Sequence, residues 1–226
     1  MILSLTAMRR RGEELFAEVP AGSLEERAVV WFSSEATREL RRLEVRSVDL
    51  LRFDIFLSHA FADRRVVAGV YRELTRLGFS VYVDWIYDPN PNRANVNATI
   101  AELLRHRMRQ CSSLFYLTTS RAQYSKWMPW ETGYFDGYDR KATSGEWSTV
   151  THDGHVAILP VLDGETEISR DAQGNPVFRG QEYLGLYCWA DVPSAAAANS
   201  RAVDIHNAGT YVPKVDFDAW IAGRWP

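Results

Sequence analysis

Short apolar runs recur through the middle of the chain, each about the length of one strand. They are rich in β-branched and aromatic residues, and their nearly continuous apolar character is typical of strands buried on both faces of a sheet. Stretches with helical spacing separate them, which implies parallel crossovers and predicts an α/β fold with a flavodoxin-like, doubly wound parallel sheet. The predicted strands cover 53–58, 79–83, 113–118 and 156–161.

Three helices are expected between these strands. The first covers 66–77 and ends before Gly78, a residue that commonly terminates helices. An apolar stripe over 100–111 predicts the second helix, and the third covers 125–138. The segment 84–95 is rich in Pro and Asn and predicts an exposed loop.

Residues 1–48 are expected to form a helical N-terminal extension. Ser23 and Glu26 have the Ser-x-x-Glu spacing of a capping box, and good helix formers follow them. Such a helix has two interpretations. It is either an arm that binds a partner or mediates oligomerisation, or a helix that packs on its own domain. The second interpretation is favoured, because amphipathic helices usually gain their stability from packing.

The main domain is expected to span 49–163, followed by a C-terminal extension over 164–226 that packs on the same domain. Within that extension, 182–187 predicts an edge strand and 215–220 a short helix. A length of 226 residues fits one main core with such additions.

Composition removes several classes of function. The formal net charge of −3 provides no basic field for nucleic acids, so we expect no nucleic-acid partner. Cys111 and Cys188 are too few for a disulfide framework and lack the paired spacing of a metal site, so we expect no metal. No run of about 18 apolar residues occurs, and Arg9 to Arg11 follow the first apolar residues instead of preceding them as in a secretory signal. We therefore expect a cytoplasmic protein that has no membrane partner.

The predicted topology also selects a site. In an open doubly wound sheet, ligands bind outside the carboxyl ends of the strands where strand order reverses. For a flavodoxin-like order, that point lies between the first and third strands, which end at Ser58-His59 and at 118–120. Glu131 lies early in the following helix, so one carboxylate is expected to face several hydroxyls.

Glu131 stands in the segment Trp127-Met128-Pro129-Trp130-Glu131. Ser125 can cap this helix, and Pro129 is tolerated in a first turn, which needs few backbone donors. The helix dipole favours an ionised carboxylate at this position. From these residues alone, a purely structural Glu131 with core tryptophans remains the favoured alternative to a catalytic one.

At this point the motifs resemble those of the Toll/interleukin receptor (TIR) domain family. The run 53–59 is similar to the family's first box, and the strand ending at Val83-Asp84-Trp85, the following loop, the strand ending at 118–120 and the Trp127-x-x-x-Glu131 helix follow in the family's order. The resemblance covers 53–163, about half of the chain. Met128 and Thr132 depart from the residues common in receptor-type members.

The resemblance implies an activity. Many prokaryotic TIR domains cleave NAD⁺ between nicotinamide and ribose with a glutamate that Glu131 matches, so a catalytic Glu131 becomes the favoured interpretation. NAD⁺ is then the substrate and no cofactor is needed. The expected enzyme is an NAD⁺ glycohydrolase or ADP-ribosyl cyclase that yields ADP-ribose or a cyclic ADP-ribose signal in bacterial antiviral defence, with a separate effector protein responding to it.

Two alternatives remain at this stage. The first is a noncatalytic TIR adaptor that forms homo-oligomers through the 84–95 loop, and the enzyme itself also has this loop as a candidate oligomer contact. The second is a nucleoside deoxyribosyltransferase-like enzyme on a similar fold.

The remaining candidate residues would bind substrate. Trp85 and Trp127 offer flat faces for nicotinamide or adenine, although core packing competes for Trp127. The hydroxyls of Ser58 and Ser120 could donate to ribose or phosphate, or only satisfy nearby backbone groups. The pyrophosphate donors would be Arg121, Arg93 and the start of the helix after Ser58-His59, and His59 is either a base or a hydrogen-bonding residue of the cleft.

Overall fold

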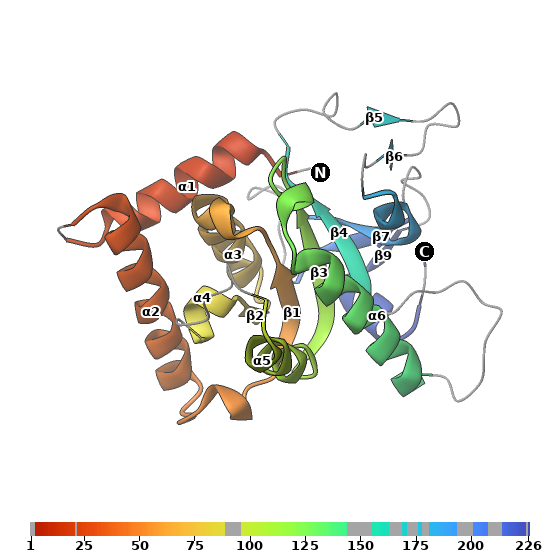
Figure 1. Cartoon of the computed structure of the whole chain (residues 1–226), viewed down its shortest axis with the longest axis horizontal. Helices are drawn as coiled ribbons and strands as arrows, with labels where there is room; N and C mark the ends of the chain where they lie inside the picture. Colours follow the sequence, from red (N-terminus) through yellow and green to blue (C-terminus); the bar gives the residue numbers. More distant parts are fainter. Residues whose placement is uncertain are drawn as a thin grey trace.

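A sheet with helices on both faces forms the centre of the protein (Figure 1). The computed structural model describes residues 3–20, 22–88, 96–143, 155–162, 169–170, 176–177, 181–193, 201–207, 214–224 and 226. The strands are β1 (Phe53–Ser58), β2 (Val81–Tyr82), β3 (Cys111–Thr118), β4 (Val156–Pro160), β5 (Ser169–Arg170), β6 (Pro176–Val177), β7 (Cys188–Asp191), β8 (Asp204–His206) and β9 (Lys214–Asp216). The α-helices are α1 (Leu5–Ala17), α2 (Leu24–Arg42), α3 (Arg64–Arg76), α4 (Asp84–Tyr87), α5 (Ala98–Met108), α6 (Met128–Thr143) and α7 (Phe217–Ile221). The 3₁₀ turns are Val48–Leu50, Phe61–Asp63, Ala122–Tyr124 and Glu182–Leu186.

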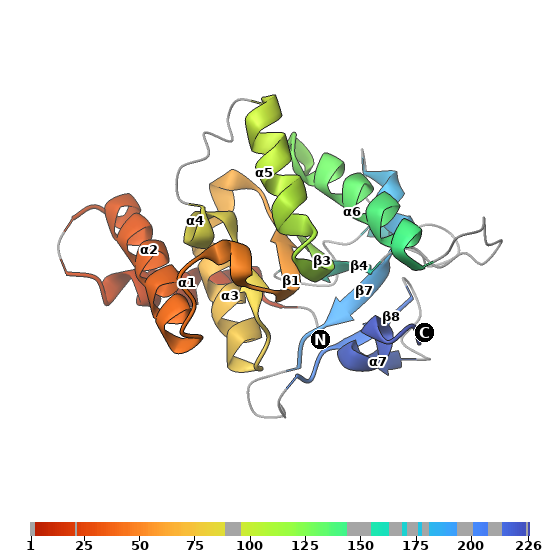
Figure 2. The same ribbon diagram turned by 90° about the horizontal axis from the view of Figure 1, so that it is seen from below.

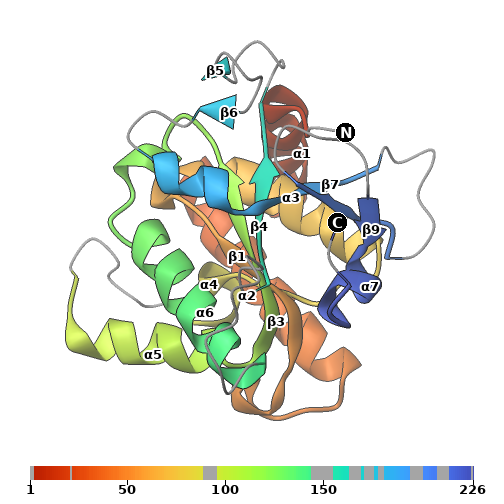
Figure 3. The ribbon, with the colours of Figure 1, turned by 90° about the vertical axis from the view of Figure 1, so that its right-hand side faces the viewer.

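The sheet confirms the predicted fold class. Among the described residues its strand order is β2-β1-β3-β4-β7-β8-β9, and the strands from β2 to β7 pair in parallel. The order reverses between β1 and β3, as in a flavodoxin-like sheet. Figure 3 shows the sheet edge-on, with α5 and α6 on one face and α1, α3 and α7 on the other.

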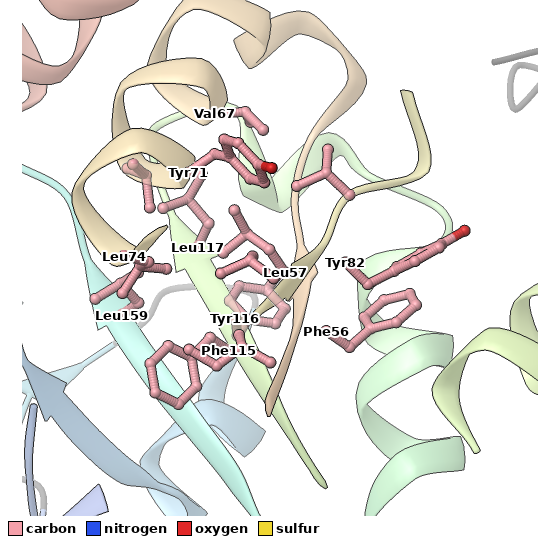
Figure 4. Close-up of a cluster of buried hydrophobic side chains, with 14 of the residues drawn as sticks. Phe56, Leu57, Val67, Tyr71, Leu74, Tyr82, Phe115, Tyr116, Leu117 and Leu159 are labelled. Atoms are coloured by element: carbon pink, nitrogen blue, oxygen red, sulfur yellow. The ribbon is translucent and has the colours of Figure 1, made fainter. Parts of the chain in front are cut away.

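The core explains why the central strands are so apolar. In β3, six successive residues from Ser113 to Thr118 are buried, since helices cover both faces of the strand. Figure 4 shows Leu57 and Leu117 on the side of α3, whereas Phe56 lies on the other side of β1, where its ring stacks on Tyr82 with centroids 5.1 Å apart. Adjacent residues of one strand thus pack in different layers.

The N-terminal helices pack on the domain, which is the interpretation that the sequence favoured. Ser23 and Glu26 form the predicted capping box at the start of α2. Phe16, Trp31 and Phe32 are each at most 2% exposed and form one aromatic cluster. Figure 2 shows both helices beside α3 and α4, at the end of the molecule away from β4.

Three predicted elements need correction. Residues 84–87 form α4 and are buried, so the expected exposed loop does not begin at Asp84, and 89–95 lie outside the described residues. The second strand is only two residues long. Residues 182–186 form a 3₁₀ turn. The strand predicted at 182–187 therefore does not form there, and a strand begins instead at Cys188, six residues after the predicted start.

The segment after Val161 enlarges the same sheet. Strand β7 pairs with β4, and β8 and β9 continue the sheet in antiparallel pairing. Of the two elements predicted in this segment, the strand at 182–187 is misplaced, whereas the helix expected at 215–220 is present as α7. The domain boundaries at 48/49 and 163/164 stay predictions.

In the described part of the chain, no helix has both the length and the apolarity to cross a membrane.

Candidate active site

The site lies where β1, β3 and the start of α6 meet. Ser58, at the end of β1, is paired in register with Tyr116 of β3. Helix α6 begins beside them, and the hydroxyl of Ser125 accepts a hydrogen bond from the amide of Met128 (3.2 Å), which is the predicted cap. Glu131 therefore lies in the first turn of α6, at the reversal point of the sheet.

Glu131 is fully buried, and Ser58 holds one of its carboxylate oxygens. Its side chain is 0% exposed, and the hydroxyl of Ser58 donates a hydrogen bond to its Oε2 at 2.6 Å. The backbone amide of Glu131 donates to the carbonyl of Trp127 (2.8 Å), so the two residues lie one turn apart on one helix face. A buried carboxylate is costly unless it is hydrogen-bonded and favourably placed, which the Ser58 hydroxyl and the helix dipole provide.

A buried tyrosine lies close enough to this carboxylate to be affected by its charge. Tyr116 is fully buried, and the side-chain amide of Gln181 donates to its hydroxyl oxygen. Burial raises the pKa of Tyr116, and neighbouring Tyr183 and the negative charge of Glu131 act in the same direction. Tyr116 thus remains a neutral phenol at physiological pH. Sequence reasoning missed Tyr116, Gln181 and Tyr183, because only the tertiary fold brings residues 181–183 to β3.

His59 is a fixed cleft residue. Its Nδ1 lies 2.7 Å from the carbonyl oxygen of Leu57, and its Nε2 lies 3.1 Å from Oδ1 of Asp84, although the second contact lacks hydrogen-bond alignment. Both ring nitrogens thus face protein oxygens, and the side chains of His59 and Asp84 are each 1% exposed. This geometry supports the hydrogen-bonding role over that of a base.

Trp85 packs between the site and the N-terminal helices. Its ring lies 4.4 Å from that of His59, 5.5 Å from that of Phe32 and 5.8 Å from that of Phe61, measured between centroids. It is 9% exposed and lines neither of the hollows described below. The structure therefore places Trp85 as a packing residue behind His59.

A crevice of about 330 Å³ lies next to the Ser58–Glu131 pair, because it is lined by His59, which follows Ser58, and by Trp127, whose carbonyl accepts from the amide of Glu131. It brings together three of the predicted residues, His59, Arg121 and Trp127. Ser58 and Glu131 lie behind this lining, and Ser120 is exposed outside it. The other lining residues, which the sequence analysis missed, are Ala60, Phe61, Ala62, Tyr124, Ser125 and Lys126. Arg93 lies outside the described residues.

Arg121 fixes one rim of the crevice. Its guanidinium donates to the carbonyl oxygen of Ala62 at 2.5 Å and lies 3.7 Å from the carboxylate of Asp63. Asp63 in turn accepts a hydrogen bond from the hydroxyl of Thr119 at 2.5 Å. The segment after β1 is thereby tied to the segment after β3, across the point of strand reversal.

A second hollow of about 530 Å³ adjoins the crevice. It lies between α1, α2 and the start of α3, and it shares Phe61, Ala62 and Arg121 with the crevice. A signal for it existed in the sequence, since Arg64-Arg65 follows directly on the first strand and its loop. The wall of this hollow that α1 and α2 form was not predictable, because these helices are far from Arg64 in the sequence.

The fold and the site define a class: a parallel sheet with a first-turn glutamate of α6 held at the β1–β3 reversal is a TIR domain. No family model matches the chain. Over 169 residues it is 39% identical to the probable 3' cyclic ADP-D-ribose synthase ThsB' of Bacillus cereus (strain MSX-D12), covering 75% of each protein. It is also 27% identical over 97 residues to the putative cyclic ADP-D-ribose synthase TIR2 of Cytobacillus dafuensis, covering 42% of this chain and 26% of that protein. The chain belongs to the family of bacterial TIR-domain cyclic ADP-ribose synthases, which confirms the resemblance found in its motifs.

Proposed function

We propose that this protein cleaves the bond between nicotinamide and ribose in NAD⁺ and closes the remaining ADP-ribose into a cyclic product. The observation that carries the proposal is the buried Glu131 carboxylate, held by Ser58 directly behind the crevice. The similarity to a probable 3' cyclic ADP-D-ribose synthase supports the same chemistry.

The carboxylate suits the charge that develops in this reaction. Nicotinamide leaves with the electron pair of the broken C–N bond as a neutral molecule, and positive charge appears on the ribose. At about 4 Å and an effective dielectric constant near 20, a carboxylate stabilises such a cation by about 4 kcal/mol, which equals roughly a thousandfold in rate. The hydrogen bond from Ser58 keeps Glu131 oriented for this role.

The nucleophile decides the product. Attack by water on the ribose C1 gives ADP-ribose, whereas attack by a hydroxyl of the adenosine ribose gives a ring, and each nucleophile loses one proton. The similarity to a probable 3' cyclic ADP-D-ribose synthase favours the cyclic product.

Substrate entry requires movement near Trp127. Glu131 does not line the crevice in this conformation, whereas Trp127 lies one turn before it and does. We infer that displacement of Trp127 lets the nicotinamide ribose reach the carboxylate, and that this step limits the basal rate. Self-association is one way to drive it, and the oligomer contact predicted at 84–95 would exclude the buried residues of α4.

The cellular role follows from the product. A cyclic nucleotide made from NAD⁺ is a signal that needs a separate responding protein, so we propose a cytoplasmic enzyme of antiviral defence that acts with an effector.

The test is incubation of the purified protein with NAD⁺, followed by chromatography and mass analysis. The account expects free nicotinamide together with a product that has the mass of ADP-ribose less one water. Absence of nicotinamide, both at high protein concentration and with a crowding agent, would leave the adaptor function as the better explanation. Release of a base from nucleosides but not from NAD⁺ would favour a deoxyribosyltransferase.

A further inference from the structure

The 530 Å³ hollow beside the crevice is positively charged on most of its rim. Four arginines line it, Arg9, Arg64, Arg65 and Arg121, against two carboxylates, Glu25 and Asp63. Asp63 is already engaged by the Thr119 hydroxyl and by Arg121. The local charge therefore favours an anionic ligand.

Two of these guanidinium groups remain available to a ligand. Arg65 forms an ion pair with Glu13 at 2.8 Å. Arg9 has no ion-pair partner among the described residues. The guanidinium of Arg64 lies over the rings of Phe61 and Trp85, 4.6 and 5.4 Å from their centroids, and forms no ion pair in the described part of the chain. Helix α3 also begins here without a side-chain cap, because Asp63 makes no capping hydrogen bond. Arginines and free backbone amides together are the usual donors to phosphate groups.

An aromatic ring stands where the hollow and the crevice meet. Phe61 lines both, and it is 54% exposed, which is unusual for a residue of this size. Helices α1 and α2 add the apolar side chains of Phe16, Leu24 and Ala28 to the lining, next to the exposed carboxylate of Glu25. A planar base can stack on such a ring while its phosphates face the arginines.

We propose that this hollow binds the adenosine diphosphate half of the dinucleotide, while the crevice holds its nicotinamide ribose. The inference rests on the proposed function for the identity of the whole substrate. The two spaces adjoin, since both are lined by Phe61, Ala62 and Arg121, so a dinucleotide would extend across these residues with its adenosine ribose at the junction. That position brings an adenosine hydroxyl towards the reacting ribose, as ring closure requires.

The N-terminal helices thereby become a wall of the substrate site. A Cβ atom on Gly12 of α1 would lie 1.9 Å from the carbonyl oxygen of Arg65, and one on Gly69 of α3 would lie 2.2 Å from that of Met8. The two helices are thus in backbone contact, and Arg11 adds an ion pair to Glu73. The wall is rigid before any ligand binds, which lowers the entropic cost of binding.

The test uses ADP as the probe and calorimetry as the measurement, on the full chain. Because a charge-assisted hydrogen bond is lost, Arg9→Ala should weaken ADP binding about tenfold, and Arg9→Glu should weaken it further. Arg10→Ala is the matched control, since Arg10 is the neighbouring arginine, has a side chain 76% exposed near Glu14 and does not line the hollow. Equal ADP affinity in the wild type and in Arg9→Glu, or no ADP binding by the wild type, would overturn the proposal.

A second measurement separates this proposal from the enzymatic one. With NAD⁺, Arg9→Glu should raise KM and shift the product from the cyclic form towards linear ADP-ribose, whereas Arg10→Ala should change neither. Binding of ADP that depends on Arg9, in a protein that releases no nicotinamide, would retain the hollow as a nucleotide site and remove the proposed function. If the protein releases nicotinamide but its ADP affinity does not depend on Arg9, the proposed function stands and the hollow is not the ADP site.

Discussion

At the scale of single residues, the chemistry depends on one hydrogen bond between two distant parts of the chain. Ser58 ends β1 and Glu131 begins α6, and their side chains meet at 2.6 Å in a fully buried position. The hydroxyl of Ser58 is directed at the carboxylate, so we assign it the role of orienting Glu131. This separates orientation of the carboxylate from binding of the substrate.

Replacing Ser58 by alanine should therefore lower kcat and leave KM nearly unchanged. Loss of a hydrogen bond to a charged group costs about 1.5–3 kcal/mol, which equals roughly a tenfold to hundredfold slower release of nicotinamide. Steady-state kinetics with NAD⁺ measures both constants. Ser112→Ala, at an exposed position of β3, is the matched control and should behave as the wild type. A Ser58→Ala enzyme with a raised KM and an unchanged kcat would contradict this assignment.

At the scale of elements, the helices α1 and α3 approach one another through glycine. The carbonyl of Arg65 occupies the space that a side chain at position 12 would need. Glycine is usually unfavourable within a helix, so its presence here has a packing reason. Helix α6 contains the opposite case, since a Cβ atom on Gly137 would meet nothing within 4 Å.

The same substitution should thus have opposite effects at the two sites. Gly12→Ala should destabilise the fold by about 1–3 kcal/mol through overpacking, despite the better helix propensity of alanine. Gly137→Ala should stabilise it by about 0.5–1 kcal/mol. Denaturant unfolding of both variants measures the difference, and a Gly12→Ala protein as stable as the wild type would show that α1 is not held in backbone contact with α3.

At the scale of the whole molecule, the C-terminal segment is tied to the first strand by charge. Arg201 donates to both carboxylate oxygens of Asp54, at 3.0 and 3.1 Å, and also pairs with Asp218. Burial alone would raise the pKa of Asp54, but the hydrogen bonds from Arg201 and Ser80 outweigh it and leave the pKa below its ordinary value of 3.8. Folding therefore favours the ionised form of Asp54.

The sign of the pH effect follows from that lowered pKa. The stabilisation is fully present above about pH 5, where Asp54 is almost completely ionised even in the unfolded chain, and is lost as the pH falls through the folded-state pKa. Asp54→Asn should cost about 1–2 kcal/mol at pH 7, and the difference from the wild type should shrink in acid. Denaturant unfolding at several pH values tests this, and a difference that stays constant from pH 7 to pH 2 would contradict it.

Much of the fold could be predicted because the central strands are long apolar runs. Strands β1, β3 and β4 and helix α3 lie where their periodicity placed them, and Gly78 ends α3 with a φ of 90°. The elements that differ from the prediction are short: β2 has two residues instead of five, and the strands β8 and β9, which were not predicted, have three each, too few for a hydrophobic period to be recognised. Residues 85–87 were assigned to a loop because of the Pro and Asn after them, although their own apolar side chains indicated burial.

The site could be predicted as far as it depends on strand ends. The reversal point brought Ser58, His59 and Glu131 into one region, as the topology rule requires. Packing decided the rest, since Trp85 is covered by Phe32 from α2, and Gln181 approaches Tyr116 from the C-terminal segment. No local pattern encodes contacts of this kind.

Glu131→Gln shows whether the Glu131 carboxylate stabilises a ribose cation. The amide keeps the size and an oxygen acceptor for Ser58 but removes the charge, so nicotinamide release should fall about a thousandfold while the thermal midpoint stays close to that of the wild type. Glu102→Gln, at an exposed position of α5 next to Arg105, is the control and should retain full activity. A folded Glu131→Gln protein that releases nicotinamide at the wild-type rate would contradict the account.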